Sequence, residues 1–227
     1  MTDDASPGDA LGEAGEGLAA QFDAAPAEVA ALYDDWVMTR YDADLVAWGY
    51  DAPARVADIV VPLLDGVGGA VLDAGCGSGL VGAELRRRGV TTIVGGDFSP
   101  ASVEIARSGG AYDEVVALDL NAPLDFADAR FAMAVSVGVF SYLTDTDATI
   151  RELLRVVEPG GWVIFTQRTD LWEERGCAEL LRRLADEQAC AVDVSSPRPY
   201  LPRHPEFGDD IEIRYVTLTR FADQPSP

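Results

Sequence analysis

The sequence contains no lysine, one histidine and only three cysteines among 227 residues. Cys76, Cys177 and Cys190 are odd in number and show no C-x-x-C spacing, so neither a disulfide framework nor a zinc cluster is indicated. No apolar run approaches the roughly 20 residues that span a bilayer, and the first ten residues lack the basic and apolar parts of a signal peptide. We therefore expect a cytoplasmic protein in a reducing compartment, with no membrane partner.

Positive charge is also scarce. The 17 basic residues are all arginines and stand against 39 acidic residues, which gives a formal net charge of −22 and a pI near 4.1. Such a surface repels polyphosphates and anionic lipids at long range. The charge therefore argues against nucleic acid as substrate or partner, and a small molecule is the partner that we expect. The oligomeric state stays open.

Three segments differ in composition. Residues 1–22 are rich in Gly, Ala, Asp and Glu with few large apolar side chains, which is typical of a disordered acidic tail. Residues 23–69 carry apolar residues at spacings of three and four, which predicts an N-terminal helical cap. In residues 70–227 short apolar runs alternate with amphipathic stretches, the pattern of an α/β domain with a mainly parallel sheet.

Within this domain the pattern predicts helices from Leu80 to Arg88, after the Ser99 cap with Pro100 at the first helical position, and near residues 171–188. A proline-rich loop separates two further extended pieces near the C-terminus, CAVDVSS and IEIRYVTLTRF. The remaining strands are predicted at about residues 70–74, 91–97, 113–118, 131–137 and 161–167.

The strongest functional signal is VLDAGCGSGL, where an apolar strand ends at Asp73 and Gly75, Gly77 and Gly79 precede a helix. Glycines allow a tight turn and let a ligand approach the main chain, and the helix N-terminus offers free N–H donors. A dinucleotide fingerprint would read G-x-G-x-x-G, but the sixth position here is Leu80, so the spacing is G-x-G-x-G. This difference favours a ligand without a pyrophosphate over a nicotinamide cofactor.

Two acidic residues follow the next two strands. Asp97 comes after the second strand, where a carboxylate can accept both hydroxyls of a ribose. Asp119 comes after the third strand, where it could accept a hydrogen bond from an adenine amino group or remain a solvated loop residue. Together they indicate a cofactor that contains a nucleoside.

The G-x-G-x-G loop, both acidic residues and the EPGGWVIF turn together resemble class I S-adenosylmethionine-dependent methyltransferases over roughly residues 70–168. YDDWVMTRYD, followed by GYDAPARVADIV, is similar to methyltransferase-like proteins of the Williams-Beuren syndrome region type. The resemblance implies a Rossmann-like α/β fold whose seven-stranded, mostly parallel sheet ends in an antiparallel terminal hairpin. It also implies S-adenosylmethionine as cofactor and methyl transfer to an unidentified small molecule.

The resemblance implies a role for each matching residue. The loop glycines would lie against the amino acid part of the cofactor, Asp73 near its ammonium, Asp97 on the ribose and Phe98 on the adenine face. Tyr33 and Tyr41 would close over the site, although both, like Trp36, are equally compatible with a place in the core. The implied cofactor-binding set is Tyr33, Tyr41, Asp73, Gly75, Cys76, Gly77, Gly79, Leu80, Asp97, Phe98, Asp119, Leu120, Ser136 and Val137.

The catalytic residue stays unassigned. Methyl transfer from a sulfonium mainly requires alignment and exclusion of water, so a base is optional, and His204, Tyr200 and Tyr142 are the candidates. Ser136 and Ser141 stand where magnesium-dependent relatives carry acidic ligands, so we expect metal-independent chemistry. Two alternatives remain, a nicotinamide-dependent oxidoreductase, which the loop spacing opposes, and a non-catalytic protein that binds S-adenosylmethionine or S-adenosylhomocysteine.

Overall fold

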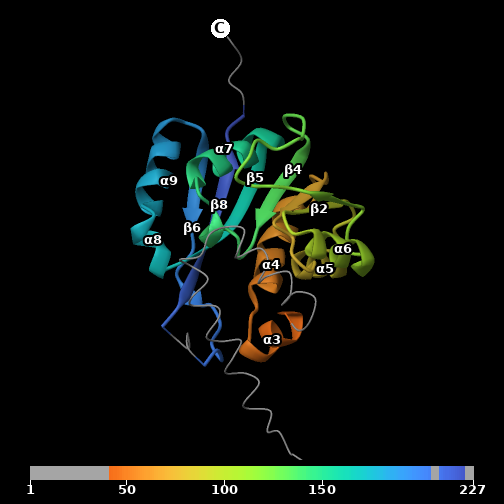
Figure 1. The fold of residues 1–227 in the computed structure, drawn as a ribbon. Coiled ribbons are helices and arrows are strands. Elements are labelled where there is room, and N and C mark those ends of the chain that lie inside the picture. Colours follow the sequence, from red (N-terminus) through yellow and green to blue (C-terminus); the bar gives the residue numbers. More distant parts are fainter. Residues whose placement is uncertain (1–40, 206–209, 223–227) are drawn as a thin grey trace, which may run out of the picture.

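The computed structural model describes residues 41–205 and 210–222, which fold around one β-sheet (Figure 1). Its strands are β1 Val71–Ala74, β2 Ile93–Asp97, β3 Glu114–Ala117, β4 Phe131–Ser136, β5 Val157–Arg168, β6 Cys190–Val194, β7 Arg198–Pro199 and β8 Glu212–Arg220. The order is β3-β2-β1-β4-β5-β8-β6, and the two-residue β7 pairs with β8. β1 to β5 pair in parallel, and β8 is antiparallel to both β5 and β6. The mostly parallel sheet with an antiparallel terminal pair is therefore confirmed, and β7 adds an eighth, edge strand.

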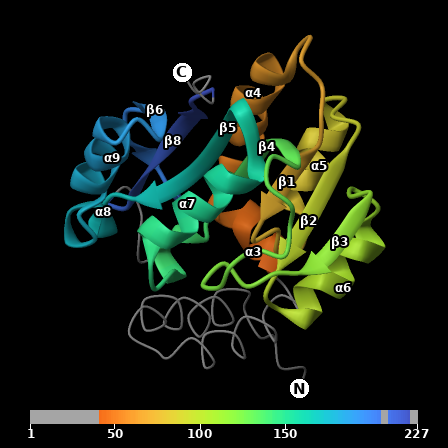
Figure 2. The ribbon, with the colours of Figure 1, turned by 90° about the horizontal axis from the view of Figure 1, so that it is seen from above.

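Helices cover both faces of the sheet (Figure 2). They are α3 Tyr41–Trp48, α4 Ala52–Leu64, α5 Leu80–Arg87, α6 Pro100–Gly109, α7 Thr146–Val156, α8 Asp170–Glu174 and α9 Cys177–Asp186, with a 3-10 turn, η2, at Phe140–Tyr142. Side chains of β1 alternate between the faces, so Val71 packs in a cluster with α4 and α5 while Leu72 packs in a cluster with α7 and α9. The core therefore consists of two apolar layers on either side of the strands.

Local signals explain where several helices begin and end. The Ser99 hydroxyl accepts a hydrogen bond from Ser102 N at 3.0 Å and Pro100 opens α6, as the sequence predicts. Gly89, with φ +92°, follows the end of α5. The prediction of one helix near residues 171–188 is wrong in one respect, because Gly176 adopts φ +59° and separates α8 from α9.

The N-terminal and C-terminal parts of the described chain meet at one end of the sheet. Trp48 of α3 lies edge-on to His204, with ring centroids 4.4 Å apart, and both side chains are buried. Arg203 N donates to Trp48 O at 3.0 Å and its guanidinium donates to Val46 O at 2.9 Å. These contacts hold α3 against the segment around His204, and Ser78 of the glycine-containing turn after β1 donates a hydrogen bond to Asp42 of α3 at 2.5 Å. The predicted tail at 1–22 lies outside the described residues, and the boundaries at 23–69 and 70–227 stay predictions.

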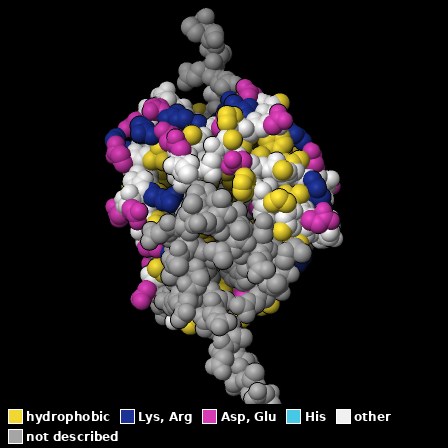
Figure 3. Space-filling view, viewed as in Figure 1, with side chains coloured by type: hydrophobic (Ala, Val, Ile, Leu, Met, Phe, Trp, Pro, Cys, Tyr) yellow, Lys and Arg dark blue, Asp and Glu magenta, His cyan; other side chains and the backbone are white. Residues whose placement is uncertain are grey.

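Acidic and arginine side chains are interspersed on the face of the molecule that Figure 3 shows. Many form ion pairs, such as Arg182 with both Glu179 and Asp186 at 2.5 Å. Such exposed pairs stabilise the fold only weakly. No helix within the described residues is long and apolar enough to cross a membrane.

Candidate functional site

The turn between β1 and α5 is held against the end of β2. Gly75 N and Cys76 N both donate to Gly96 O, at 2.7 and 3.0 Å, and Gly77 N donates to Asp97 Oδ2 at 2.8 Å. Gly75, Gly77 and Gly79 have φ values of +82°, +54° and +104°. A Cβ on Gly75 would also lie 2.4 Å from a methyl group of Val139. Glycine is therefore required at Gly75 both by its conformation and by the close approach of Val139.

A cavity of about 1140 Å³ opens at the carboxyl ends of β1 to β4. The carboxyl edge of a parallel sheet, where the strand order reverses, is the usual place for a ligand in such folds. Its walls come from the turn after β1, the ends of β2, β3 and β4, the loop from η2 to α7, and the α8–α9 region. The lining residues that matter below are Tyr41, Tyr50, Gly75, Cys76, Gly77, Leu80, Asp97, Phe98, Leu118, Asp119, Leu120, Asn121, Val137, Ser141, Tyr142, Thr144, Asp145, Asp147, Arg175, Glu179 and Arg183.

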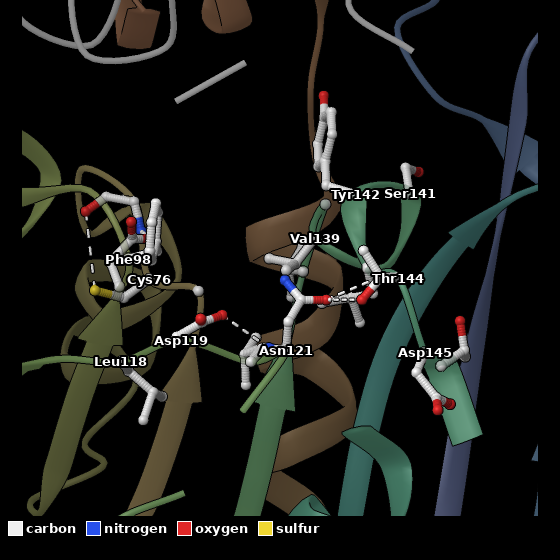
Figure 4. Close-up of a pocket in the computed structure, with 18 of the residues that line it drawn as sticks. Cys76, Phe98, Leu118, Asp119, Asn121, Val139, Ser141, Tyr142, Thr144 and Asp145 are labelled. Carbon is white, nitrogen blue, oxygen red and sulfur yellow. Dashed lines mark hydrogen bonds between the residues drawn. The ribbon is translucent and has the colours of Figure 1, made fainter. Parts of the chain in front are cut away.

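One side of the cavity combines a carboxylate with apolar walls. Asp97 Oδ2 accepts from Gly77 N, and Oδ1 accepts from Ser99 N at 2.9 Å. The next side chain, Phe98, is 60 % exposed, so the face of its ring is available in the cavity. Figure 4 shows Phe98, Cys76, Leu118 and Asp119 gathered on this side. A flat aromatic ligand attached to a polyhydroxylated group fits such a wall.

The opposite side is built by the segment after β4 and by α8–α9. Ser141, Tyr142, Thr144 and Asp145 lie there in Figure 4. Asn121 connects the two sides, because its Oδ1 accepts from both the backbone N and the hydroxyl of Thr144 at 2.8 Å. The cavity therefore has two distinct sides that share a floor at the end of β4.

Asp73 lies behind the glycine turn and is not among the lining residues. It is fully buried, and Tyr112 donates a hydrogen bond to its Oδ2 at 2.7 Å, while Gly82 N donates to the same tyrosine oxygen at 3.2 Å. Oδ1 has no hydrogen-bond partner among the described residues. Burial raises the pKa of Asp73 to about 7, and the Tyr112 hydrogen bond opposes this rise. Burial also raises the pKa of the Cys76 thiol, which makes a nucleophilic role for it unfavourable.

The structure brings most of the predicted cofactor residues together in the wall of the cavity. These are Tyr41, Gly75, Cys76, Gly77, Leu80, Asp97, Phe98, Asp119, Leu120 and Val137. Asp73, Gly79 and Ser136 lie outside that wall, and the Ser136 hydroxyl instead donates to Ala74 O at 2.7 Å. Tyr33 lies outside the described residues. The assignment of each residue to a part of the cofactor stays a prediction.

The three candidate bases are separated. Tyr142 lines the cavity, and burial raises its pKa. Tyr200 packs edge-on to Tyr50, with ring centroids 5.6 Å apart, and His204 is buried beside Trp48. Neither Tyr200 nor His204 is among the lining residues, and the catalytic residue stays unassigned.

Within residues 41–205 and 210–222, no group of three or more His, Cys, Asp and Glu side chains is arranged to hold a metal ion.

Sequence reasoning missed several residues of this region. Tyr50 lines the cavity, and Tyr112 supports the glycine turn from a position 39 residues after Asp73. Arg175 donates to Phe140 O, Ser141 O and Leu143 O at 3.1, 2.7 and 2.8 Å and so fixes the segment around η2. The one signal for Arg175 was the adjacent Gly176, which marks the break between α8 and α9.

Part of the chain is similar in sequence to known proteins. Residues 72–165 match the family model described as methyltransferase domain. Human methyltransferase-like protein 27 is 35% identical over 142 residues, which are 61% of this chain and 57% of that protein, so the chain spans little more than half of this relative. Methyltransferase GfsG of Streptomyces halstedii is 26% identical over 226 residues, which are 91% of this chain and 80% of that protein.

Among solved structures, an S-adenosylmethionine-dependent methyltransferase from Mesorhizobium loti superposes with a TM-score of 0.57. It shares 17% identity, and the match covers 73% of this chain and 96% of that one. At this identity the likeness concerns the fold alone. Residues 72–165 are thus similar to a methyltransferase domain, and the fold is the Rossmann-like fold of the S-adenosylmethionine-dependent methyltransferases.

Proposed function

We propose that this protein transfers a methyl group from S-adenosylmethionine to a small organic molecule, without a metal ion. The observation that carries the proposal is the two-sided cavity, in which the glycine turn, Asp97 and Phe98 form one side and the segment after β4 forms the other. A cofactor and an acceptor can meet in such a space, above the end of β4.

The residues present fit an adenosyl cofactor. A Cβ at Gly77 would meet no atom within 4 Å, so the turn leaves open space on that side of its main chain. The backbone N–H groups of Gly77 and Ser99 donate to one carboxylate oxygen each of Asp97. Those contacts fix the carboxylate for two adjacent ribose hydroxyls, while the exposed ring of Phe98 offers a face to adenine.

When bound, the cofactor supplies a methyl group on an electrophilic sulfonium. The protein's part is to align the acceptor in line with that methyl group and to exclude water. Val137, directly after β4, and Tyr41 and Tyr50 from the α3–α4 region line the cavity. Their apolar surface limits the access of water to this region.

The proposal is tested by incubating the full chain with methyl-labelled S-adenosylmethionine and a metabolite extract. We expect label in a low-molecular-weight product, at a rate that the Asp97→Ala variant strongly reduces. The control is Asp125→Ala, because Asp125 is exposed and lies outside the cavity wall. Cofactor binding without transfer in broad extracts would instead support a non-catalytic binder, a reading that none of the named relatives supports.

We also propose that the protein acts in the cytoplasm, where the three free cysteines would remain reduced.

A further inference from the structure

The side of the cavity opposite Phe98 differs from the cofactor side in charge. We call it the acceptor wall, defined by Ser141, Tyr142, Thr144, Asp145, Asp147, Arg175, Glu179 and Arg183. Three of these residues are carboxylates and two are arginines. With Asp97 and Asp119 on the other side, five carboxylates and two guanidinium groups line the cavity, a formal balance of −3. The acceptor wall alone has a formal balance of −1, so both the wall and the cavity as a whole disfavour an anion.

The two guanidinium groups are already engaged. Arg183 forms a salt bridge with Asp147 at 2.5 Å, and Asp147 forms a second salt bridge with Arg151 at 2.8 Å. Arg175 donates its hydrogen bonds to the carbonyl oxygens of the segment around η2 and so is oriented by that backbone. Arg175 forms no ion pair among the described residues, but its donors are directed at backbone carbonyl groups, and Arg183 holds the carboxylate of Asp147, so an anionic acceptor would have to share these guanidinium groups. Outside the described residues the sequence offers a single further basic residue, Arg40.

Two carboxylates of the cavity form no ion pair with any described residue. Asp119 accepts a hydrogen bond from Asn121 N at 2.8 Å, and Asp145 caps α7 by accepting from Ala148 N at 2.9 Å. Both therefore keep a formal negative charge that no arginine in the described part of the chain neutralises. Three tyrosines, Tyr41, Tyr50 and Tyr142, line the same cavity. Aromatic faces and carboxylates together attract cations.

The reaction itself moves positive charge from sulfur to the acceptor. Carboxylates placed where charge develops stabilise the transition state, whereas they oppose a reaction on an anion, whose charge would be brought beside theirs. An amine nitrogen also attacks with its own lone pair. Among the described residues the cavity wall contains no histidine that could act as the base for an alcohol.

We propose that the acceptor is a small amine and that methylation takes place on its nitrogen. This inference rests on the proposed function. The ammonium form that the carboxylates attract first gives one proton to water or to a carboxylate of the wall. The freed nitrogen lone pair then forms the new N–CH3 bond as the S–CH3 bond breaks, and the electrons of that bond stay on sulfur as a neutral thioether. For a primary or secondary amine, the extra proton on nitrogen then passes to water or to a carboxylate of the wall. No oxidant, reductant or metal takes part.

The experiment follows labelled methyl transfer from S-adenosylmethionine to a panel of small amines, phenols and carboxylic acids, and to a metabolite extract. We expect products that are retained on a cation exchanger and keep their label after mild base. Label released by base as methanol would reveal a methyl ester, and a neutral, base-stable product would reveal an ether. Either result overturns the amine assignment while leaving methyl transfer itself intact. Absence of any transfer would instead contradict the proposed function, and the inference with it.

Asp145→Asn provides the matched variant, because asparagine also caps helices and so removes the charge while keeping the cap of α7. We expect KM for the amine to rise about threefold to tenfold, as for the loss of one partly screened charge near a cation. The affinity for S-adenosylmethionine should stay unchanged, and Asp125→Asn should leave both values unaltered. An unchanged KM in Asp145→Asn would remove this carboxylate from acceptor recognition and contradict the electrostatic argument.

Discussion

The buried carboxyl group of Asp73 should make the free energy of unfolding depend on pH, and replacing this residue by asparagine should remove that contribution. Burial is the main reason why the pKa of this group rises from 3.8, the ordinary value for an aspartic acid side chain, to about 7 in the folded protein. Between these two values the unfolded chain releases this proton while the folded protein retains it. The folded state then binds more protons, so this group makes the free energy of unfolding fall as pH rises, and the loss levels off above pH 7.

The magnitude follows from the size of the shift. One pKa unit corresponds to about 1.4 kcal/mol. Between pH 5 and pH 8 the Asp73 carboxyl group should therefore lower the free energy of unfolding by about 2–3 kcal/mol. In Asp73→Asn the side chain is neutral at every pH, and its amide oxygen can still accept the hydrogen bond from Tyr112. The amide nitrogen, however, would occupy the place of Oδ1, which has no partner among the described residues, at a cost of about 1–3 kcal/mol.

Urea denaturation at several pH values between 5 and 8 measures this difference. We expect Asp73→Asn to be the less stable protein at pH 5 and to gain on the wild type by about 2–3 kcal/mol by pH 8. Asp125→Asn, at an exposed position, is the control and should follow the wild-type profile. Parallel profiles of wild type and Asp73→Asn would refute the reasoning, because they would mean that the buried carboxyl group does not change its protonation on unfolding.

Three further substitutions test the architecture of the site. In Gly75→Ala the new Cβ would lie 2.4 Å from Val139 at a positive φ, so we expect a loss of about 1–3 kcal/mol in urea denaturation and loss of cofactor binding in calorimetry. The ring of Phe98 is 60 % exposed, so Phe98→Ala should change stability by less than about 0.5 kcal/mol but weaken cofactor binding about tenfold. If Phe98→Ala bound the cofactor as tightly as the wild type, the ring would be excluded from the adenine site. Arg175→Leu removes three hydrogen bonds to carbonyl groups and should lower stability by about 2–4 kcal/mol and raise the acceptor KM more than the cofactor Kd. A variant as stable as the wild type would show that Arg175 does not fix the segment around η2.

Much of the fold could be predicted because its signals are local. Apolar runs of four to six residues set β1 to β4, and the Ser99–Pro100 pair sets the start of α6. The break at Gly176 was missed because an isolated glycine within an apolar periodic segment is also tolerated inside a helix. Only the tertiary structure shows that Arg175 must leave the helix to reach the carbonyl groups around η2.

For the site, the sequence indicated which strand ends meet but not which side chains face the cavity. Asp97 and Phe98 lie in its wall, as their place after β2 suggests, whereas Asp73 at the end of β1 lies behind the glycine turn. Side-chain alternation along a strand does not reveal that Tyr112 fills the space over that carboxyl group. Tyr50 likewise reaches the cavity only through the packing of the α3–α4 region against the sheet.

The most direct test of the account is calorimetric titration of the full chain with S-adenosylmethionine, compared with the same titration of Asp97→Ala and Asp125→Ala. The account predicts one binding site in the wild type and in Asp125→Ala, and an affinity at least about tenfold weaker in Asp97→Ala, since two hydrogen bonds to a charged group are lost. Equal affinities in all three proteins, or no binding by the wild type, would contradict the claim that the glycine turn and Asp97 form the cofactor site.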